Sequence, residues 1–440
     1  MEILIKAGQL ILSLSILVIF HEAGHFFFAK LFKTRVEKFY LFFNPWFSLF
    51  KTKWGETEYG IGWLPLGGYV KISGMIDESM DKEQMKLPAE PWEFRSKPAW
   101  QRLLIMLGGV LVNFLLAFAI YVMILSVWGK EYLPTENVKY GVTVDSLGRE
   151  FGLQTGDKII SANNKTIENF RTIVPEILLN EPRTLQIERN GQNMEIEFTD
   201  KMIGQIIKHK APFFAVRIPF VASKFTKDSP AKSAGMIEGD RIIALNGQQV
   251  LYFDEFKSKL AEFKNKDVKV TVVRSGQNKD LTVRISDKGL LGVFPRGNLS
   301  EFFELRKIEY SLVEAVPAGV SKGYDEVGNY LKQFKLIFNA ETKAYESVGG
   351  FIAIGNIFPA EWDWQIFWSM TALLSIMLAV INILPIPALD GGHVLFLFFE
   401  IISGRKPSDK FLEYAQIVGM VLLFSLLIFA NGNDIVKLFN

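Results

Sequence analysis

FHEAGHFFFA, residues 20 to 29, places three ionisable side chains inside an apolar run. On a helix, His21 and His25 are four residues apart, so they lie on one face, where both imidazoles reach the same metal ion. Zinc lowers the pKa of a water molecule to about 7, and Glu22 beside the histidines then takes its proton during attack on a peptide carbonyl. Ionisable groups within a membrane span are costly unless they are paired, bind a metal or line a wet cavity. We therefore interpret this stretch as a metal site and not as a solvent-facing helix surface.

The chain around this motif has the composition of a membrane protein, because 49% of its 440 residues are hydrophobic. Four apolar runs, near residues 7 to 29, 103 to 128, 366 to 387 and 411 to 430, approach the roughly 20 residues that a membrane-spanning helix needs. The first run has no small-residue cleavage site, so we interpret it as a span and not as a signal peptide. The net charge of +2 gives no field for nucleic acid, and the absence of cysteine excludes thiolate ligands.

Flanking charges predict the orientation of the spans. Basic residues follow the first span, precede the second and separate the third from the fourth: Lys30, Lys33, Arg35, Lys38, Arg95, Lys97, Arg102, Arg405, Lys406 and Lys410. Such residues mark the cytoplasmic side of a membrane. We expect both termini and residues 130 to 365 on the opposite side, which in a bacterium is the periplasm. The active site then lies near the cytoplasmic side of the inner membrane.

A duplication marks the central segment. GLQTGDKII at residues 152 to 160 recurs as GMIEGDRII at residues 235 to 243, and each copy continues to an asparagine, Asn163 and Asn246. The pattern resembles PDZ domains, and its glycines and isoleucines suit turns and buried strands. A PDZ fold can accept an extended peptide on a sheet edge. An alternative is a size filter that admits only substrates with small extracytoplasmic parts.

NILPIPALDGGH, residues 382 to 393, contains the candidates for a third metal ligand. Asp390 is the carboxylate closest to an otherwise apolar region, and the prolines and glycines break the helix so that it can turn toward the first span. His393 competes with Asp390 as the ligand. The residue types favour Asp390 and leave both open, whereas His209, in the central segment, is expected to be an ordinary surface histidine.

Taken together, the HExxH motif, the N-x-x-P-x-P-x-L-D-G-G segment and the two repeats resemble the site-2 protease family of intramembrane zinc metalloproteases. Within that family the chain is similar to the bacterial RseP-type regulators of sigma-E. The resemblance covers nearly the whole chain. It implies that His21, His25 and Asp390 hold zinc, that Glu22 is the catalytic base, and that His393 is a neighbour of the site.

Cleaving a membrane helix requires local unwinding, and lipid offers the freed backbone groups no partners. Residues 55 to 72 fit two short strands around Leu64-Pro65, and the family has a membrane-reentrant β-hairpin at this place, thought to present an edge to the substrate. An ordinary cytoplasmic hairpin is the alternative. Asn382 either contacts the substrate, as the resemblance implies, or joins helices by hydrogen bonds. The residues assigned to substrate binding are Asn382, Pro385, Gly67, Gly68 and Tyr69.

We therefore predict a polytopic α-helical membrane protein with four transmembrane helices, a membrane-associated β-hairpin and two α+β PDZ-like domains between helices 2 and 3. We expect residues 305 to 340 to form two amphipathic stretches, separated by Pro317 and Gly319, that help gate entry. The predicted segments are helix 1 with HExxH (1–35), the cytoplasmic-side segment with the hairpin (36–100), helix 2 (101–129), the two PDZ-like domains (130–210 and 211–298), amphipathic linker helices (299–362), helix 3 with the LDGG motif (363–404), and helix 4 with the C-terminal tail (405–440).

The leading functional hypothesis is a zinc endopeptidase acting in regulated intramembrane proteolysis. It cleaves single-span membrane proteins, such as anti-sigma factors or remnant signal peptides, in or near their membrane segment. Its cofactor is Zn²⁺, and its partners are these substrates, the lipid bilayer and peptides that the PDZ-like domains accept. One alternative is a non-catalytic, membrane-anchored PDZ scaffold without zinc. Another is an HExxH membrane protease with a glutamate ligand on a later helix, which the LDGG segment and the repeats disfavour.

Overall fold

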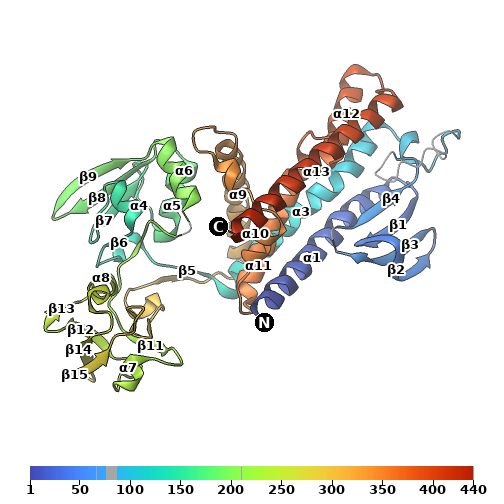
Figure 1. Cartoon of the computed structure of the whole chain (residues 1–440). Coiled ribbons are helices and arrows are strands. Elements are labelled where there is room, and N and C mark those ends of the chain that lie inside the picture. Colours follow the sequence, from blue (N-terminus) through green and yellow to red (C-terminus); the bar gives the residue numbers. More distant parts are fainter. Residues whose placement is uncertain (66, 76–86, 210, 440) are drawn as a thin grey trace. The chain divides into compact units, whose positions relative to one another are not determined.

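The computed structural model describes the whole chain except residues 66, 76–86, 210 and 440 (Figure 1). The described residues form two compact units. The helical unit comprises Met1–Gly129, Glu309–Phe334 and Tyr345–Asn440, and the repeat unit comprises Lys130–Ile308 and Lys335–Ala344. Both segments of the repeat unit therefore lie, in the sequence, between the second and third long apolar helices.

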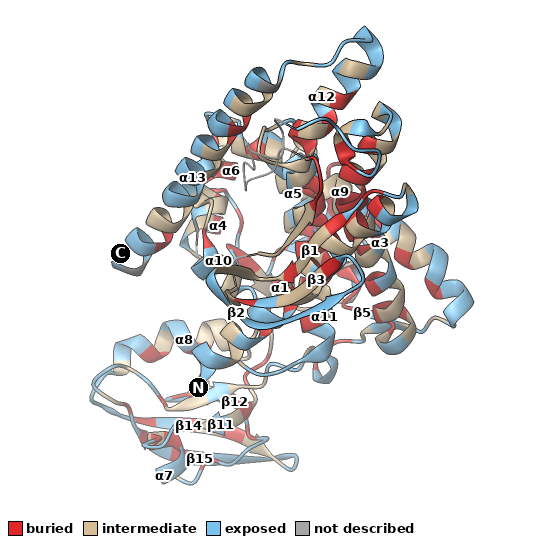
Figure 2. Cartoon of the chain, turned by 90° about the vertical axis from the view of Figure 1, so that its right-hand side faces the viewer, coloured by how far each residue is buried: buried red, intermediate tan, exposed pale blue. Residues whose placement is uncertain are grey.

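Within the described residues, four helices of the helical unit are long and apolar enough to span a membrane, and they lie where the four spans were predicted. These helices are α1 (Glu2–Leu31), α3 (Ala99–Trp128), α11 (Trp364–Ile383) and α13 (Asp409–Phe439). Helix α3 packs against both α1 and α11. Helix α13 is largely exposed along its length in Figure 2, as expected of a helix that meets lipid.

A glycine crossing brings α1 and α3 together. A Cβ atom on Gly24 would lie 2.2 Å from the carbonyl oxygen of Gly108, and a Cβ on Gly108 would lie 2.6 Å from that of Gly24. Only glycine fits at both positions, and small residues are the usual means by which membrane helices approach closely. Gly24 belongs to the HExxH motif, so the crossing places the motif directly against α3.

The third span breaks as the prolines and glycines of its end predict. Helix α11 ends at Ile383, a turn follows, and α12 (Asp390–Ser403) begins at Asp390. Gly391 and Gly392 permit this tight turn, because a Cβ on either would lie 2.2 Å and 2.6 Å from carbonyl oxygens of the preceding segment. The segment predicted as one helix, residues 363 to 404, is thus two helices.

A small sheet follows α1. Its strands are β1 (Val36–Leu41), β2 (Phe43–Trp54), β3 (Thr57–Leu64) and β4 (Tyr69–Ile72), in the spatial order β2-β3-β1-β4. The hairpin predicted over residues 55 to 72, of which Leu66 lies outside the described residues, is wrong in its pairing. Strand β3 forms its hairpin with β2 and runs parallel to β1, whereas β4 pairs antiparallel with β1. Strands β3 and β4 therefore lie on opposite sides of β1. In the sequence they still appear as two strands separated by a turn, which is also the pattern of a hairpin.

Helix α9 corrects the prediction for residues 305 to 340. It runs without interruption from Leu312 to Ile337 and includes Pro317 and Gly319. Pro317 lies near the start of the helix, where it removes a single backbone hydrogen bond. Gly319 allows close approach to α3, because a Cβ there would lie 2.6 Å from the backbone nitrogen of Val122. A short helix, α10 (Phe351–Asn356), follows in the helical unit.

The repeat unit consists of two similar halves with separate hydrophobic cores. The first half contains β6 (Val142–Val144), α4 (Ser146–Glu150), β7 (Lys158–Ala162), α5 (Ile173–Leu179), β8 (Thr184–Arg189), β9 (Gln192–Glu197), α6 (Asp200–Lys208) and β10 (Phe214–Val216). The second contains β11 (Ala222–Phe225), α7 (Pro230–Ser233), β12 (Arg241–Leu245), β13 (Gln248–Gln249), α8 (Phe253–Leu260), β14 (Asp267–Arg274), β15 (Gln277–Arg284) and β16 (Val293–Pro295). The main sheets are β7-β8-β9 and β13-β12-β14-β15, and a pair formed by β5 (Lys130–Tyr132) and β17 (Arg306–Ile308) joins the ends of the inserted segment.

Candidate metal centre

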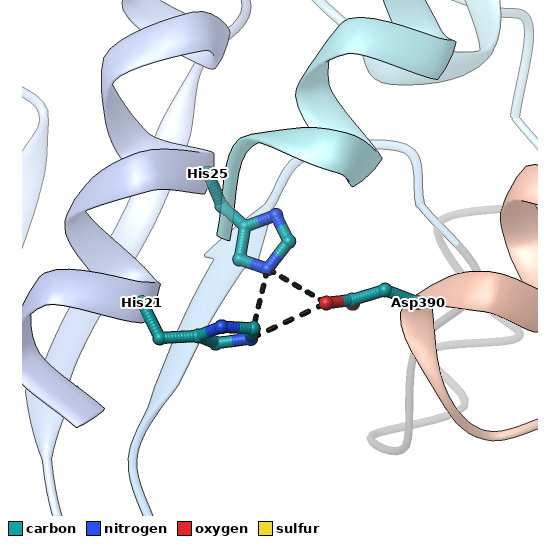
Figure 3. A group of neighbouring side chains, drawn as sticks. All are labelled: His21, His25 and Asp390. Atoms are coloured by element: carbon teal, nitrogen blue, oxygen red, sulfur yellow. Dashed lines mark hydrogen bonds and ion pairs between the residues drawn. The ribbon is translucent and has the colours of Figure 1, made fainter. Parts of the chain in front are cut away.

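Three donor atoms converge between α1 and the start of α12. His21 and His25 project from one face of α1, one turn apart, and Asp390 is the first residue of α12 (Figure 3). The two imidazole Nε2 atoms are 3.3 Å apart, and Asp390 Oδ2 lies 3.2 Å from His21 Nε2 and 3.3 Å from His25 Nε2. Both histidines are buried. Among the described residues, this is the one group of histidine and carboxylate side chains with the spacing of a metal site.

The spacing and chemistry of these donors fit zinc. Tetrahedral zinc bound at about 2.0–2.1 Å holds its ligands about 3.3 Å apart, which matches the three distances. His25 Nδ1 is 2.8 Å from the carbonyl oxygen of Ile105. A carbonyl only accepts hydrogen bonds, so Nδ1 carries a proton, and in the neutral imidazole Nε2 then presents a lone pair. Asp390 Oδ2 is buried and receives no hydrogen bond. Lone pairs that face one another in a buried site are stable when a cation lies between them.

Helix α3 forms the wall behind the two histidines. A Cβ atom on Gly109 would lie 2.5 Å from His25 Nε2 and 2.6 Å from His21 Cε1, so only glycine leaves room for both rings. Ile105 supplies the carbonyl that orients His25, and Asn113 lies beside His21. We did not predict any of these three residues. The paired glycines and the polar Asn113 one turn later, inside an apolar span, are the signal that would have indicated them.

The predicted catalytic base shares a cavity with the donors. A cavity of about 390 Å³ is lined by His21, Glu22, His25 and Asp390, together with residues of β4. The backbone amide of Val70 in β4 interacts with the Glu22 carboxylate. A half-buried carboxylate thus lies beside the three donors, where it can take a proton from a reacting water molecule.

The cavity also contains part of the predicted substrate-binding set. Gly68 and Tyr69 line it, and Asn382 Nδ2 lies 3.3 Å from His21 Nε2. Asn382, Gly67 and Pro385 are not among its lining residues. Asn382 reaches the site only through its approach to His21, Gly67 lies against the ring of Phe43, and Pro385 lies in the turn between α11 and α12.

The two remaining histidines lie outside the donor group. His393 lines the cavity without joining the three donors. His209 is in the repeat unit, where it is half-buried and paired with Asp145, so it is not a simple surface residue. Of the four histidines, only His21 and His25 therefore present nitrogens to the candidate metal position.

Strand β4 presents an edge to the cavity. It pairs with β1 on one side, no strand in the described residues pairs with its other side, and all four of its residues line the cavity. Tyr69 is fixed by a stack on Tyr40, with ring centroids 5.3 Å apart, and by a hydrogen bond of 2.9 Å from its hydroxyl to Asn44 Oδ1. Burial raises the pKa of Tyr69 to about 12, so the hydroxyl stays protonated and remains a donor. The edge is therefore held rigidly next to the donors.

Comparison with known proteins gives matches over almost the whole chain. A family model described as Peptidase family M50 matches residues 9–426, which include all three donors and the repeat unit. A Neisseria meningitidis protein named as a zinc metalloprotease is 27% identical over 452 aligned positions, covering 97% of this chain and 98% of that protein. A Haemophilus influenzae protein named regulator of sigma E protease is 26% identical over 457 positions, covering 100% of both chains.

Proposed function

Because the chain belongs to peptidase family M50, we propose that it is an intramembrane zinc endopeptidase that cleaves single-span membrane proteins within or near their transmembrane segment. The observation that carries the proposal is the shared cavity: the three donors, the Glu22 carboxylate and the edge of β4 all line it. Metal ligands, a base and a backbone edge are the parts that peptide hydrolysis requires.

The donors, Glu22 and Asn382 each have a defined task in this proposal. His21, His25 and Asp390 hold zinc, which when bound acts as a Lewis acid and makes water a competent nucleophile near neutral pH. Glu22 takes the proton of the attacking water and returns it to the leaving amine. Asn382, 3.3 Å from His21 Nε2, is placed to donate a hydrogen bond to the scissile carbonyl as negative charge develops on its oxygen.

Substrate binding by strand addition fits the edge of β4. An unwound membrane helix exposes backbone N–H and C=O groups that lipid cannot satisfy. An extended substrate segment beside Tyr69–Ile72 would pair those groups with β4, and this would hold a peptide bond next to Glu22. The resulting preference is for substrates that unwind easily at the cleavage position.

The repeats and the orientation complete the proposal. We place the two PDZ-like halves and both termini in the periplasm and the cavity near the cytoplasmic side of the inner membrane, following the basic residues that flank the spans. The repeats then restrict access to substrates with small extracytoplasmic parts or bind extended peptides. Anti-sigma factors and remnant signal peptides are single-span substrates with these properties.

Cleavage by reconstituted protein tests the function. Purified wild type and Glu22→Gln are placed in liposomes with a model single-span substrate, and products are located by mass spectrometry. Loss of the base should slow cleavage by about 10²–10⁴-fold while zinc content is unchanged. Equal cleavage by the two proteins would refute the role of Glu22. No cleavage by zinc-loaded wild type across a panel of single-span substrates would instead favour a membrane-anchored scaffold.

A further inference from the structure

We infer that Asn113 is a positioning residue for the metal site, whose carboxamide oxygen accepts a hydrogen bond from His21 Nδ1–H and so holds Nε2 toward the metal. Asn113 lies on α3, is completely buried, and places Nδ2 3.2 Å from His21 Nδ1. Its Oδ1 is buried without a hydrogen-bond partner. This inference rests on the proposed role of His21 as a metal ligand.

The proton on His21 determines which end of the Asn113 carboxamide faces it. His21 Nε2 points at His25 Nε2 and Asp390 Oδ2, so a neutral His21 that ligates through Nε2 must carry its proton on Nδ1. An amide Nδ2 facing Nδ1–H would place two donors against each other. A half-turn of the carboxamide exchanges its oxygen and nitrogen and puts an acceptor opposite Nδ1–H. The same half-turn brings Asn113 Oδ1, which otherwise has no hydrogen-bond partner, to the Nδ1–H donor of His21.

The two histidines are then oriented by the same helix. Ile105 O accepts from His25 Nδ1–H at 2.8 Å, and Asn113, eight residues later on α3, performs the equivalent task for His21. Ile105 acts through its backbone, so substitution cannot remove its acceptor. Asn113 acts through its side chain, which makes the effect of the acceptor measurable. Acceptors of this kind typically change metal affinity by about 10–100-fold.

Helix packing is the competing explanation for a buried asparagine in a span. The Asn113 backbone already has a packing contact, because the Ser375 hydroxyl on α11 donates to its carbonyl oxygen at 2.7 Å. Ser375→Ala therefore removes an interhelical hydrogen bond at the same residue without touching the carboxamide. It is the matched control for a purely structural role.

Zinc retention by the full-length protein in detergent tests the inference without any proteolysis assay. Wild type, Asn113→Leu, Asn113→Asp and Ser375→Ala are titrated with a chelator, and the cobalt(II) forms are compared by visible absorption. We expect Asn113→Leu to lose zinc at about 10–100-fold lower chelator activity and to show an altered cobalt spectrum. Asn113→Asp keeps an acceptor and should retain zinc within about threefold of wild type, as should Ser375→Ala.

Two results would overturn the inference: wild-type zinc retention by Asn113→Leu, or equal loss of zinc from Asn113→Leu and Asn113→Asp. Thermal unfolding of the metal-free proteins identifies a variant that fails to fold. In that event Asn113→Ala replaces it, with the same expected loss. Zinc retention that depends on Asn113 in a protein that cleaves no substrate would refute the protease and leave this inference standing. If wild type binds no zinc, both fail.

Discussion

Asp390 of the helical unit and two aspartates of the repeat unit are withdrawn from water, but their surroundings differ. In the repeat unit, Asp157 and Asp240 are 1% and 0% exposed. Arg189 Nη2 donates to Asp157 Oδ2 at 2.7 Å, and Arg274 Nη2 donates to Asp240 Oδ2 at 2.6 Å. Each carboxylate also accepts a hydrogen bond from the backbone amide three residues before it. The same network therefore occurs in both halves, and each aspartate has a full set of donors.

Asp390 in the helical unit has the opposite surroundings. Its buried Oδ2 faces two imidazole nitrogens and receives no hydrogen bond. A buried anion without donors is costly unless a cation completes its surroundings. The comparison teaches that donors, and not burial alone, separate a structural carboxylate from a candidate metal ligand.

Removing Asp390 should give the largest effect of the substitutions that test this comparison. In Asp390→Ala we expect zinc content to fall from one per chain to nearly none, and cleavage with it. The metal-free variant should lose only about 1 kcal/mol of stability, because Asp390 has no arginine or amide donor and loses only its contacts with the two imidazole nitrogens and with the N-terminus of α12. Metal analysis and thermal unfolding of chelator-treated protein measure the two quantities.

Asp240→Ala is the matched control for Asp390→Ala, and the expected pattern is reversed. It should keep zinc and destabilise the second half of the repeat unit, because Arg274 loses its buried partner. A metal-free Asp390→Ala protein that unfolds as readily as Asp240→Ala would show that Asp390 has structural partners after all. The contrast between Asp390 and Asp240 would then be lost.

The sequence predicts the parts of the site that depend on local patterns. The spacing of His21 and His25 is a property of one helix, and the break before Asp390 is a property of its own prolines and glycines. The role of α3 could not be predicted in this way. Gly109 and Asn113 belong to the site because α1 and α3 cross at Gly24, and a crossing point is not encoded in either helix alone.

The pairing of the strands could not be predicted from local patterns either. A strand-turn-strand pattern predicts two strands near residues 57 to 72, but it does not reveal that β1 lies between them. The arginine partners were missed for a related reason. Arg189 lies 32 residues after its aspartate and Arg274 lies 34 residues after its own, so the duplicated run does not include them and the spacing differs between the halves.

The pH dependence of stability in the second half of the repeat unit tests the same comparison of carboxylates, and the expected effect is smaller. Burial alone would raise the pKa of Asp240, but the hydrogen bonds from Arg274 and the Ile237 amide hold it below the ordinary value of 3.8. The folded pKa is therefore lower than the unfolded one. The stabilisation is present above pH 3.8 and is lost as the pH falls below it.

In Arg274→Met we expect the slope of stability against pH to change sign. Burial then dominates and raises the pKa of Asp240, so the variant should lose about 3 kcal/mol at pH 7 and recover part of it on acidification toward pH 4. Hydrogen exchange of the β12 and β14 amides in the full chain, corrected for intrinsic rates, measures this. Arg284→Met, which removes an exposed pair with Asp267, should leave the slope unchanged. A wild-type slope in Arg274→Met would contradict the assigned partner.

The smallest expected effect distinguishes the two halves from each other. Asn163 and Asn246 both have positive φ, 51° and 46°, so replacement by glycine removes the side chain without adding backbone strain. Each Oδ1 accepts a strand amide, from Thr184 at 3.0 Å and from Lys269 at 2.9 Å. Asn163 is buried and also donates to the carbonyl oxygen of Glu176 at 3.0 Å, whereas Asn246 is exposed.

Replacing the asparagine by glycine should therefore lower the free energy of unfolding more in the first half than in the second. We expect about 1–3 kcal/mol for Asn163→Gly, which leaves buried groups unpaired, and about 0.5–1 kcal/mol for Asn246→Gly, where water replaces the lost bond. Exchange of the Thr184 and Lys269 amides reports each loss directly. Equal losses of stability would mean that the hydrogen bond to the strand amide, which both halves share, determines how much each substitution destabilises the protein. A larger loss of stability for Asn163→Gly would show that the hydrogen bonds of a buried side chain contribute most, as they do for Asp157 and Asp240.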